Sequence, residues 1–315
     1  MDTMRKIIIL LIISTLPIIA RGQYTDIINS NQPGNSQSAY AVGRKVLQFE
    51  GGLWFEQRNH KYTYTDMTLV GLNYSARYGV LSDKFEAVLN GTLAYDHTHY
   101  HYLGSQRSNN IGFINNTIGA KYLIYNPYFD EKPNLYSWKA NNKFQWKRLI
   151  PAVGVYAGMN FFPNKRFYYD NIPTLSPKAV VSLQSHPMPR VVLVANLIAN
   201  RFLDSNRELG YIATLTHNID NGRFSIFLES EGIQSHYYSD HILRLGGAYL
   251  FTKDIQVNVD LGASWKDTPS RYMGLIGFSY RIDKHLDVIK KEILKGNEEE
   301  FKPTKIKRKK KWLLF

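Results

Sequence analysis

Cysteine is absent from the 315-residue sequence. In an exported protein this excludes a disulfide framework, a thiol nucleophile, a lipid-anchored N-terminal cysteine and a cysteine-ligated zinc site. The chain also lacks a glycine-rich phosphate loop and an HExxH motif. Beyond the N-terminus, no stretch approaches the roughly 18 apolar residues that a helical membrane span needs. Abundant Tyr (22) and Phe (16) favour strands instead.

The one long apolar run lies at the N-terminus. Arg5 and Lys6 precede the unbroken apolar stretch 7–13, and the small residues Ala20 and Gly22 stand at positions −3 and −1 of a cut before Gln23. This pattern predicts that residues 1–22 are a cleaved signal peptide. A membrane-anchoring helix is the alternative, but the run is short and contains a proline.

The body of the chain alternates apolar with small or polar residues, which is the period of a strand. In the segment 255–265, the residues Val257, Val259 and Leu261 share one face, whereas Asn258 and Asp260 share the other. About twelve such segments occur, most of them long enough to cross a bilayer at a tilt. They lie near 42–57, 64–79, 84–97, 109–125, 149–162, 176–185, 190–202, 208–219, 222–233, 239–251, 255–265 and 271–282.

These segments predict an all-β fold: a transmembrane antiparallel up-and-down β-barrel of about 12 strands in the outer membrane of a Gram-negative bacterium. With both termini periplasmic, the connections near 80–83, 186–189, 220–221 and 252–254 face inward and are short. The connections 98–108 and 163–175 face outward and are longer, as barrels show. One inward connection, 126–148, is long, and we expect it to hold a short helix or to reach into the lumen.

The domain organisation expected is a signal peptide (1–22), a plug-like segment (23–41), the barrel (42–282) and a basic periplasmic tail (283–315). The tail begins with helical spacing and carries eleven Lys/Arg against six Asp/Glu. Two interpretations stay open: a solvated disordered tail, or a handle for a periplasmic protein, peptidoglycan or phospholipid headgroups. The handle would use Lys305, Lys307, Arg308, Lys309, Lys310, Lys311 and Trp312.

The start of the mature chain reads TDIINSNQPGNSQS at 25–38, followed by Val42-Gly43 and by QFEGG at 48–52. It resembles the opening of the transporter-like outer-membrane barrels grouped as the MetA-pathway phenol-degradation family. The run NLYSWKAN at 134–141 and the run LIPAV at 149–153 resemble members from Bacteroidota. The resemblance covers about 25–282 and implies import of aromatic compounds. Gln32 replaces the usual Arg before Pro, and the basic tail is not part of the shared pattern.

Charges of both signs fall on the polar faces of the predicted strands. They are either mutually paired charges that fill a narrow lumen, or a charged constriction that selects solutes. The candidate lumen-lining residues are Glu50, Arg77, Glu86, Lys121, Glu229, Arg244, Asp260 and Arg281, with Asp96 and Glu231 on the same faces.

His97, His99 and His101 alternate in the expected loop 98–108 and its edge. Side chains at i and i+2 of an extended chain share one face, so three imidazoles could meet a metal there. The spacing is weak evidence, and an exposed polar loop rich in His and Tyr is the favoured interpretation. No other metal site and no cofactor are expected.

Catalysis is the least supported class. An outer-membrane phospholipase needs a Ser and a His oriented by a third polar group on the lipid-facing side. His217 with Ser225, or His236 with Ser239, could meet across a hairpin, but neither pair sits in a recognisable motif.

The leading hypothesis is therefore a channel or transporter-like barrel for small solutes, with hydrophobic or aromatic ones included by the resemblance. The alternative is a non-conducting barrel, plugged by 25–41, that docks a periplasmic partner or an envelope secretion or gliding complex. The net charge of +13 points to an anionic surface or an acidic partner, because an exported chain meets no nucleic acid. Outer-membrane lipids are the expected surroundings in either case.

Overall fold

The structure is a computed structural model of the chain. It describes residues 25, 27–32, 34–101, 106–128, 143–161, 167, 173–204, 207–219, 222–236 and 238–285. The predicted signal peptide, the run 134–141 and the basic tail from residue 286 onward lie outside the described residues. The proposed handle, from Lys305 to Trp312, is therefore untested.

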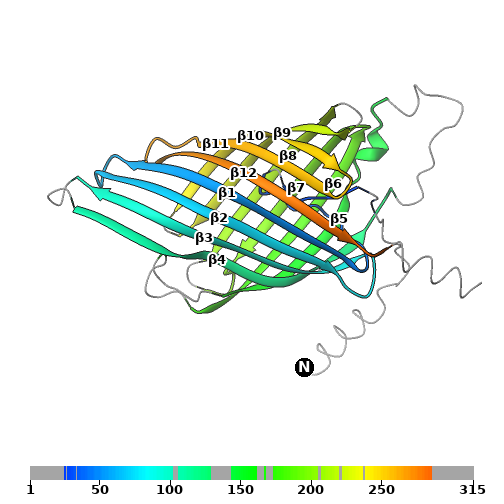
Figure 1. Ribbon diagram of the computed structural model, residues 1–315, viewed down its shortest axis with the longest axis horizontal. Helices are drawn as coiled ribbons and strands as arrows, with labels where there is room; N and C mark the ends of the chain where they lie inside the picture. The colour runs from blue at the N-terminus through cyan, green and yellow to red at the C-terminus, as the bar shows by residue number, and fades with distance from the viewer. Residues whose placement is uncertain are drawn as a thin grey trace, which may run out of the picture.

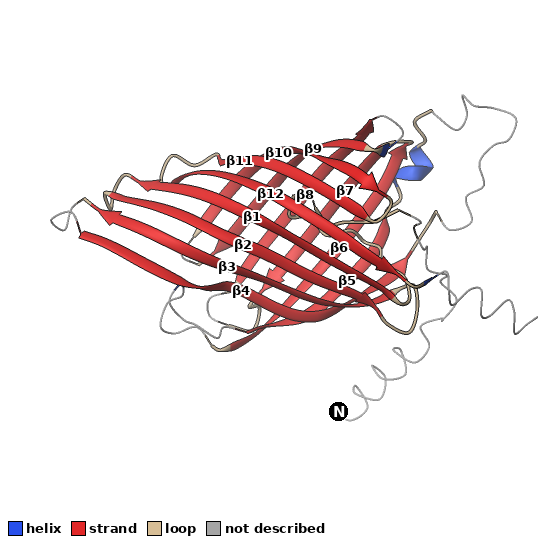
Figure 2. Ribbon diagram, in the orientation of Figure 1, coloured by secondary structure: helices blue, strands red, loops and turns tan. Residues whose placement is uncertain are grey.

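Twelve antiparallel strands close into one barrel, in which each strand pairs with its sequence neighbours and β12 pairs with β1. Figures 1 and 2 show the tilted strands wrapped around a common interior. The predicted up-and-down barrel is thus confirmed. The strands are β1 (Val46–His60), β2 (Thr65–Gly79), β3 (Phe85–Tyr100), β4 (Gln106–Tyr125), β5 (Ala152–Phe161), β6 (Leu175–Met188), β7 (Val191–Asn200), β8 (Glu208–Ile219), β9 (Phe224–Ser235), β10 (Ser239–Thr252), β11 (Ile255–Ser264) and β12 (Ser270–Asp283).

Side chains along each strand alternate between the outer surface and the interior. Outward-facing Leu53 and Ile276 are 65% and 66% exposed, whereas inward-facing Gln48, Arg77 and Glu229 are completely buried. An apolar exterior around a polar interior is the reverse of a soluble protein. It is the arrangement of a barrel whose outer surface faces lipid.

The two ends of the barrel differ in their connections. We call the end where β1 begins and β12 ends the near end, and the opposite end the far end. Four near-end connections are short: 80–84, 189–190, 220–223 and 253–254. The fifth, between β4 and β5, is long, and its described part contains a single 3-10 turn, η1 (Trp146–Leu149).

Two details of the expected secondary structure were wrong. The connection expected over 98–108 is only residues 101–105, because β3 and β4 continue as a paired hairpin that places His97 and His99 in β3. The residues at this end of the hairpin are mostly polar, so the sequence showed no alternation that would predict a strand. β5 starts at Ala152 instead of 149 because η1 occupies the preceding turn. Among the described residues, no helix combines the length and apolarity needed to cross a membrane.

Candidate functional site

The N-terminal segment runs through the barrel interior. We call residues 25–42 the inner segment, of which residues 26 and 33 are not described. It hydrogen-bonds to side chains from nine of the twelve strands, all around the wall, so it lies inside the barrel. The wall residues are Ser279 and Arg281 in β12, Gln48 and Glu50 in β1, Arg77 in β2, Glu86 in β3, Lys121 in β4, Gln184 in β6, Asn196 in β7, Glu229 and Glu231 in β9, and Gln256 in β11.

A buried charge cluster holds the ends of the inner segment against β1 to β4. Arg77 lies 3.2 Å from Glu50 and 3.1 Å from Glu86, and Lys121 lies 2.7 Å from Glu86. Two cations thus face two carboxylates, so no net charge is buried. Such balance is needed because an unpaired ion in a dry interior is strongly destabilising.

The same four side chains also bind the backbone of the inner segment. Arg77 donates to the carbonyl oxygens of Asn29 (2.9 Å) and Tyr40 (3.3 Å), and Lys121 donates to that of Ser38 (3.1 Å). In return, Glu86 accepts from the amide of Val42 at 2.8 Å. Hydrogen bonds to charged groups are stronger than those between neutral groups, so this cluster fixes the inner segment at residues 29, 38, 40 and 42.

A second cluster holds the middle of the inner segment. The Glu229 carboxylate accepts the backbone N–H groups of Asn35 (3.1 Å) and Ser36 (3.2 Å), and the Thr214 hydroxyl (2.8 Å). Arg244 lies 3.1 Å from Glu229 and also pairs with Glu231. The Arg244 guanidinium compensates the charge of Glu229. The Glu229 carboxylate provides hydrogen-bond acceptors for backbone N–H groups of the inner segment at this bend.

Glycine permits the close approach of the inner segment to the wall. A Cβ atom on Gly154 of β5 would lie 2.4 Å from the carbonyl oxygen of Ala39, which is well inside van der Waals contact. Ala39 is fully buried there, in a small apolar cluster with Tyr40, Leu123 and Ala152. Burial raises the pKa of the Tyr40 phenol, so this side chain stays neutral.

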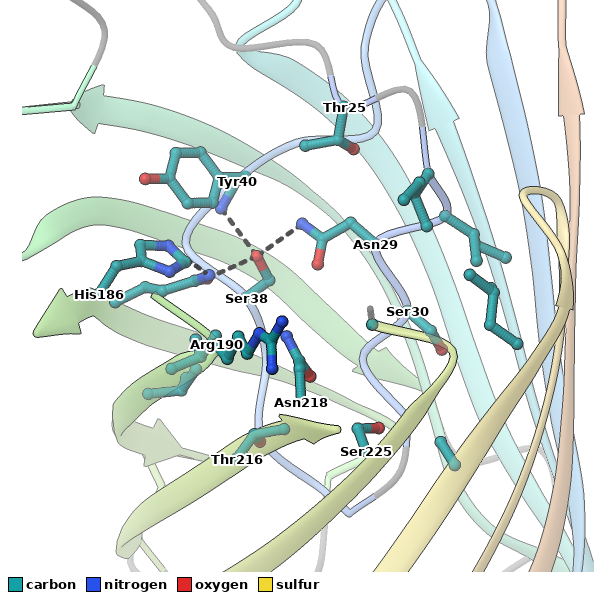
Figure 3. Close-up of a pocket in the computed structure, with 18 of the residues that line it drawn as sticks. Thr25, Asn29, Ser30, Ser38, Tyr40, His186, Arg190, Thr216, Asn218 and Ser225 are labelled. Atoms are coloured by element: carbon teal, nitrogen blue, oxygen red, sulfur yellow. Dashed lines mark hydrogen bonds between the residues drawn. The ribbon is translucent and has the colours of Figure 1, made fainter. Parts of the chain in front are cut away.

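The inner segment divides the lumen into two cavities that share Asn31 and Gln32 as lining residues. The near cavity has a volume of about 860 Å³ and is shown in Figure 3. The far cavity has a volume of about 480 Å³. The residues that separate them lie between Asn31 and Gln37.

The far cavity carries charges of both signs together with apolar side chains. Its wall includes Trp54, Glu56, Arg58, Lys178, Ile198, Glu208, Ile212, Glu231, Ile242, Arg244, Asp260, Arg271 and Leu275. Trp54 points inward, over Gly71, so it does not join the aromatic residues of the outer surface. Towards the far end, Arg271 pairs with Asp240 (3.0 Å) and with Glu56. Tyr238, in the adjoining connection, donates to Asp240, and burial raises its pKa to about 12.

The predicted lumen residues lie at four places. Glu50, Arg77, Glu86, Lys121, Glu229, Glu231 and Arg244 form the two clusters around the inner segment. Asp260 lines the far cavity, and Asp96 accepts from Thr98 and Asn110 in the β3–β4 hairpin. Arg281 lies at the near end, where it binds Asp254 (2.9 Å) and the carbonyl oxygen of Thr25 (2.8 Å).

The three candidate metal-binding histidines are not brought together with a shared set of ligands. His97 contacts Asn109, and His101 contacts Asp66 at 2.8 Å. The rings of His99 and His101 lie 4.2 Å apart. In the described part of the chain, no group of three or more His, Asp or Glu side chains could hold a metal ion.

The candidate Ser/His pair on the β8–β9 hairpin is separated by the barrel wall. His217 is exposed on the outer surface, whereas Ser225 lines the near cavity. Their spacing across the hairpin was compatible with a contact, but the side-chain alternation places them on opposite faces.

Sequence reasoning missed the arginines of the near cavity. Arg148, Arg190 and Arg223 line it from three connections at the near end. The period of a strand assigns no face to a turn residue, so these side chains had no predicted direction. The only sequence signal was that the near-end connections contain basic residues, and it did not distinguish these arginines from Lys84 and Lys253.

Comparisons with known proteins agree with this architecture. One match is the crystal structure of the COG4313 outer membrane channel from Pseudomonas putida F1, with a TM-score of 0.50 and 14% identity over 80% of this chain and 100% of that one. At this identity the likeness is one of fold. The translocator domain of the autotransporter NalP from Neisseria meningitidis has a TM-score of 0.43, with 9% identity over 76% and 89% of the two chains. The CymD monoaromatic hydrocarbon channel has a TM-score of 0.41, with 9% identity over 77% and 90%.

No curated protein matches the sequence. A family model described as "Putative MetA-pathway of phenol degradation" matches residues 30–282, which include most of the inner segment and nearly the whole barrel. The fold is that of an outer-membrane channel barrel, and the chain belongs to this family.

Proposed function

We propose that this protein is an outer-membrane channel through which small solutes pass, with the inner segment as its constriction. The observation that carries the proposal is the divided lumen: two cavities of about 480 and 860 Å³ meet at the same inner-segment residues. Within the stretch 31–37 of the inner segment, Ser36 lines the near cavity, Gly34, Asn35 and Gln37 line the far cavity, and Asn31 and Gln32 line both.

The size and chemistry of the cavities support small solutes. Both volumes lie in the range of small-molecule sites, about 300–1,000 Å³. The far cavity offers Trp54, Ile198, Ile212 and Leu275 beside its charged groups, which suits a solute with an apolar body.

The connections support one orientation within this proposal. Four of the five near-end connections are short, with the β4–β5 connection as the exception, and the far-end connection between β5 and β6 is longer, as for the periplasmic and external sides of outer-membrane barrels. The far cavity then opens to the exterior, and the inner segment enters from the periplasm.

Liposome swelling tests the proposal. The refolded full-length chain in liposomes should admit small solutes and exclude larger ones, with a cutoff set by the inner segment. Removal of residues 25–41 should move that cutoff to larger solutes. A correctly folded full-length barrel that admits no solute of any size would contradict the proposal.

A second candidate is a plugged barrel that serves as an attachment point. The observation that favours it is the number of anchors, because side chains from nine strands hold the inner segment. The basic tail would then bind a periplasmic protein or peptidoglycan. Truncation of 296–315 distinguishes the two: loss of a co-purifying complex with solute passage intact supports attachment through the tail, and loss of passage with complexes intact contradicts it.

A further inference from the structure

The far cavity contains a carboxylate that no other group of the wall satisfies. Every charged residue in the described lining of this cavity forms an ion pair with another side chain, except Asp260 and Lys178. Asp260 is only 5% exposed, and no group in the described part of the chain donates a hydrogen bond to it. Buried polar groups in folded proteins are nearly always hydrogen-bonded, so this carboxylate requires an explanation.

Arg244 acts electrostatically on Asp260, but its hydrogen bonds go to other groups. Its Nη1 atom donates to Glu229 at 3.1 Å and also to Glu231, while its Nη2 atom lies 3.5 Å from the sulfur of Met273. Glu229, Glu231 and Asp260 therefore share a single guanidinium. The excess of negative charge at this part of the wall attracts cations.

The neighbours of Asp260 along the wall are apolar. Trp54, Leu275 and Asp260 lie in one lateral row across β1, β12 and β11, because Leu275 pairs with both of the others. All three line the far cavity. On the other side of Asp260 the row continues with Gly246, against which the ring of Phe227 lies. Leu275 and Phe227 have no hydrogen-bond donor in their side chains, so a donor for Asp260 can come only from the cavity.

The same row offers an aromatic surface. The Trp54 ring leans over Gly71 of β2, where a Cβ atom would lie 2.5 Å from it, so the ring is on the side of β1 away from Asp260. Because neighbouring strands are about 4.8 Å apart, the backbones of Trp54 and Asp260 are separated by about 10 Å, with Leu275 between them. The row thus presents an aromatic ring, an aliphatic side chain and a carboxylate in that order. A solute with an apolar body and a cationic group at one end matches this order.

Lys178, the other charged lining residue without an ion pair, does not neutralise Asp260. It lies in β6, five strands away from β11 around the barrel, and Glu208 and Glu231 act on it electrostatically. Lys178, Asn200 and Glu208 form one lateral row of β6, β7 and β8. A lysine side chain is long and flexible, so its ammonium group can move to these carboxylates of the wall. The short side chain of Asp260 cannot reach a cation in this way.

We propose that the far cavity binds small organic cations, namely ammonium compounds with an apolar or aromatic body. Asp260 is the counter-ion, because an ammonium group and a carboxylate form a charge-assisted hydrogen bond. Trp54 and Leu275 contact the body of the solute. Binding does not require an open barrel, whereas passage of such a cation through the lumen rests on the proposed function.

Equilibrium binding to the folded full-length protein in detergent tests this site. The probe is phenylethylammonium, with phenylethanol as its neutral counterpart and phenylpropionate as its anionic one. Isothermal titration on the native chain should show binding of the ammonium compound. The alcohol should bind at least about tenfold more weakly, because it lacks the charge-assisted hydrogen bond, and the anion more weakly still.

Asp260→Asn keeps the size of the side chain and removes its charge. It should bind the ammonium compound at least about tenfold more weakly than the native chain does, with the affinity for the alcohol nearly unchanged. Asp66→Asn is the matched control, because it removes the same charge from an exposed residue of β2 outside the far-cavity lining, and the affinity should not change. Equal affinity of Asp260→Asn and the native chain for the ammonium compound would overturn the inference. The comparison of the three compounds needs no variant, and equal affinities of the native chain for them would also overturn it.

Ion current through the channel gives an independent measurement. Phenylethylammonium in the far cavity should interrupt the current, and Asp260→Asn should require at least about tenfold more of the compound for the same block. Conductance without any binding of the ammonium compound overturns this inference and leaves the proposed function standing. Binding of the compound by a non-conducting barrel overturns the proposed function and supports the site.

Discussion

At the scale of single residues, the carboxylate of Glu229 fixes the middle of the inner segment. It accepts two backbone amides and one hydroxyl, and its charge is compensated by Arg244. Glu229→Gln keeps the shape but removes the charge and at least one acceptor. We expect the inner segment to lose about 1.5–3 kcal/mol of its attachment to the wall.

Maleimide labelling measures this effect, because the chain has no native cysteine. Ser36→Cys should be labelled about tenfold faster, or more, in the Glu229→Gln background, since 1.4 kcal/mol is a factor of ten. Glu208→Gln is the control, because Glu208 also lines the far cavity but bonds to Asn200 and Arg201 instead. Equal labelling rates in the two backgrounds would refute the role of Glu229.

The missing side chain of Gly154 leaves room for the inner segment. Gly154→Ala places a Cβ atom 2.4 Å from the carbonyl oxygen of Ala39, so the inner segment must move away from β5. We expect the free energy of unfolding to fall by about 1–3 kcal/mol, as for other overpacked sites. Gly274→Ala meets no atom nearer than 3.3 Å and should change it by much less. Urea unfolding of both variants in lipid vesicles measures the two free energies of unfolding, and equal losses would contradict the prediction.

At the scale of strands, the outer surface stabilises the barrel only in an apolar surrounding. Val259 lies near the middle of β11, faces outward and is 53% exposed. Val259→Arg should lower the free energy of unfolding in lipid vesicles by about 2–4 kcal/mol, the cost of an arginine at the bilayer midplane. Leu203→Arg, in the exposed connection after β7, should have almost no effect. Equal losses for both variants would place β11 outside the membrane.

The strands were predictable because one simple pattern determined them. In β11 and β12 every second residue is apolar, and a register error would have reversed the two faces. The same pattern placed Glu50, Arg77, Glu86, Lys121 and Glu229 on interior faces. It could not give their contacts with the inner segment, because that segment has no period. Composition misled at the β3–β4 hairpin, where polar residues still pair in a regular ladder.

At the scale of the whole molecule, the inner segment converts a barrel into two chambers of different charge. The far cavity is mixed in sign, while the described lining of the near cavity is cationic. Glu50, Arg77, Glu86, Lys121 and Glu229 in the strands hold the inner segment, whereas Arg148, Arg190 and Arg223 in the near-end connections line the near cavity. The size limit for solutes would therefore reside in the inner segment.

The central claim is that solutes cross the lumen past the inner segment. Single-channel conductance of the refolded mature chain, with and without residues 25–41, tests it most directly. We predict steady conductance from the full-length chain and a severalfold larger step after the deletion, because the wall remains closed while the constriction is removed. A silent full-length chain that conducts only after the deletion would contradict the claim and identify the barrel as plugged.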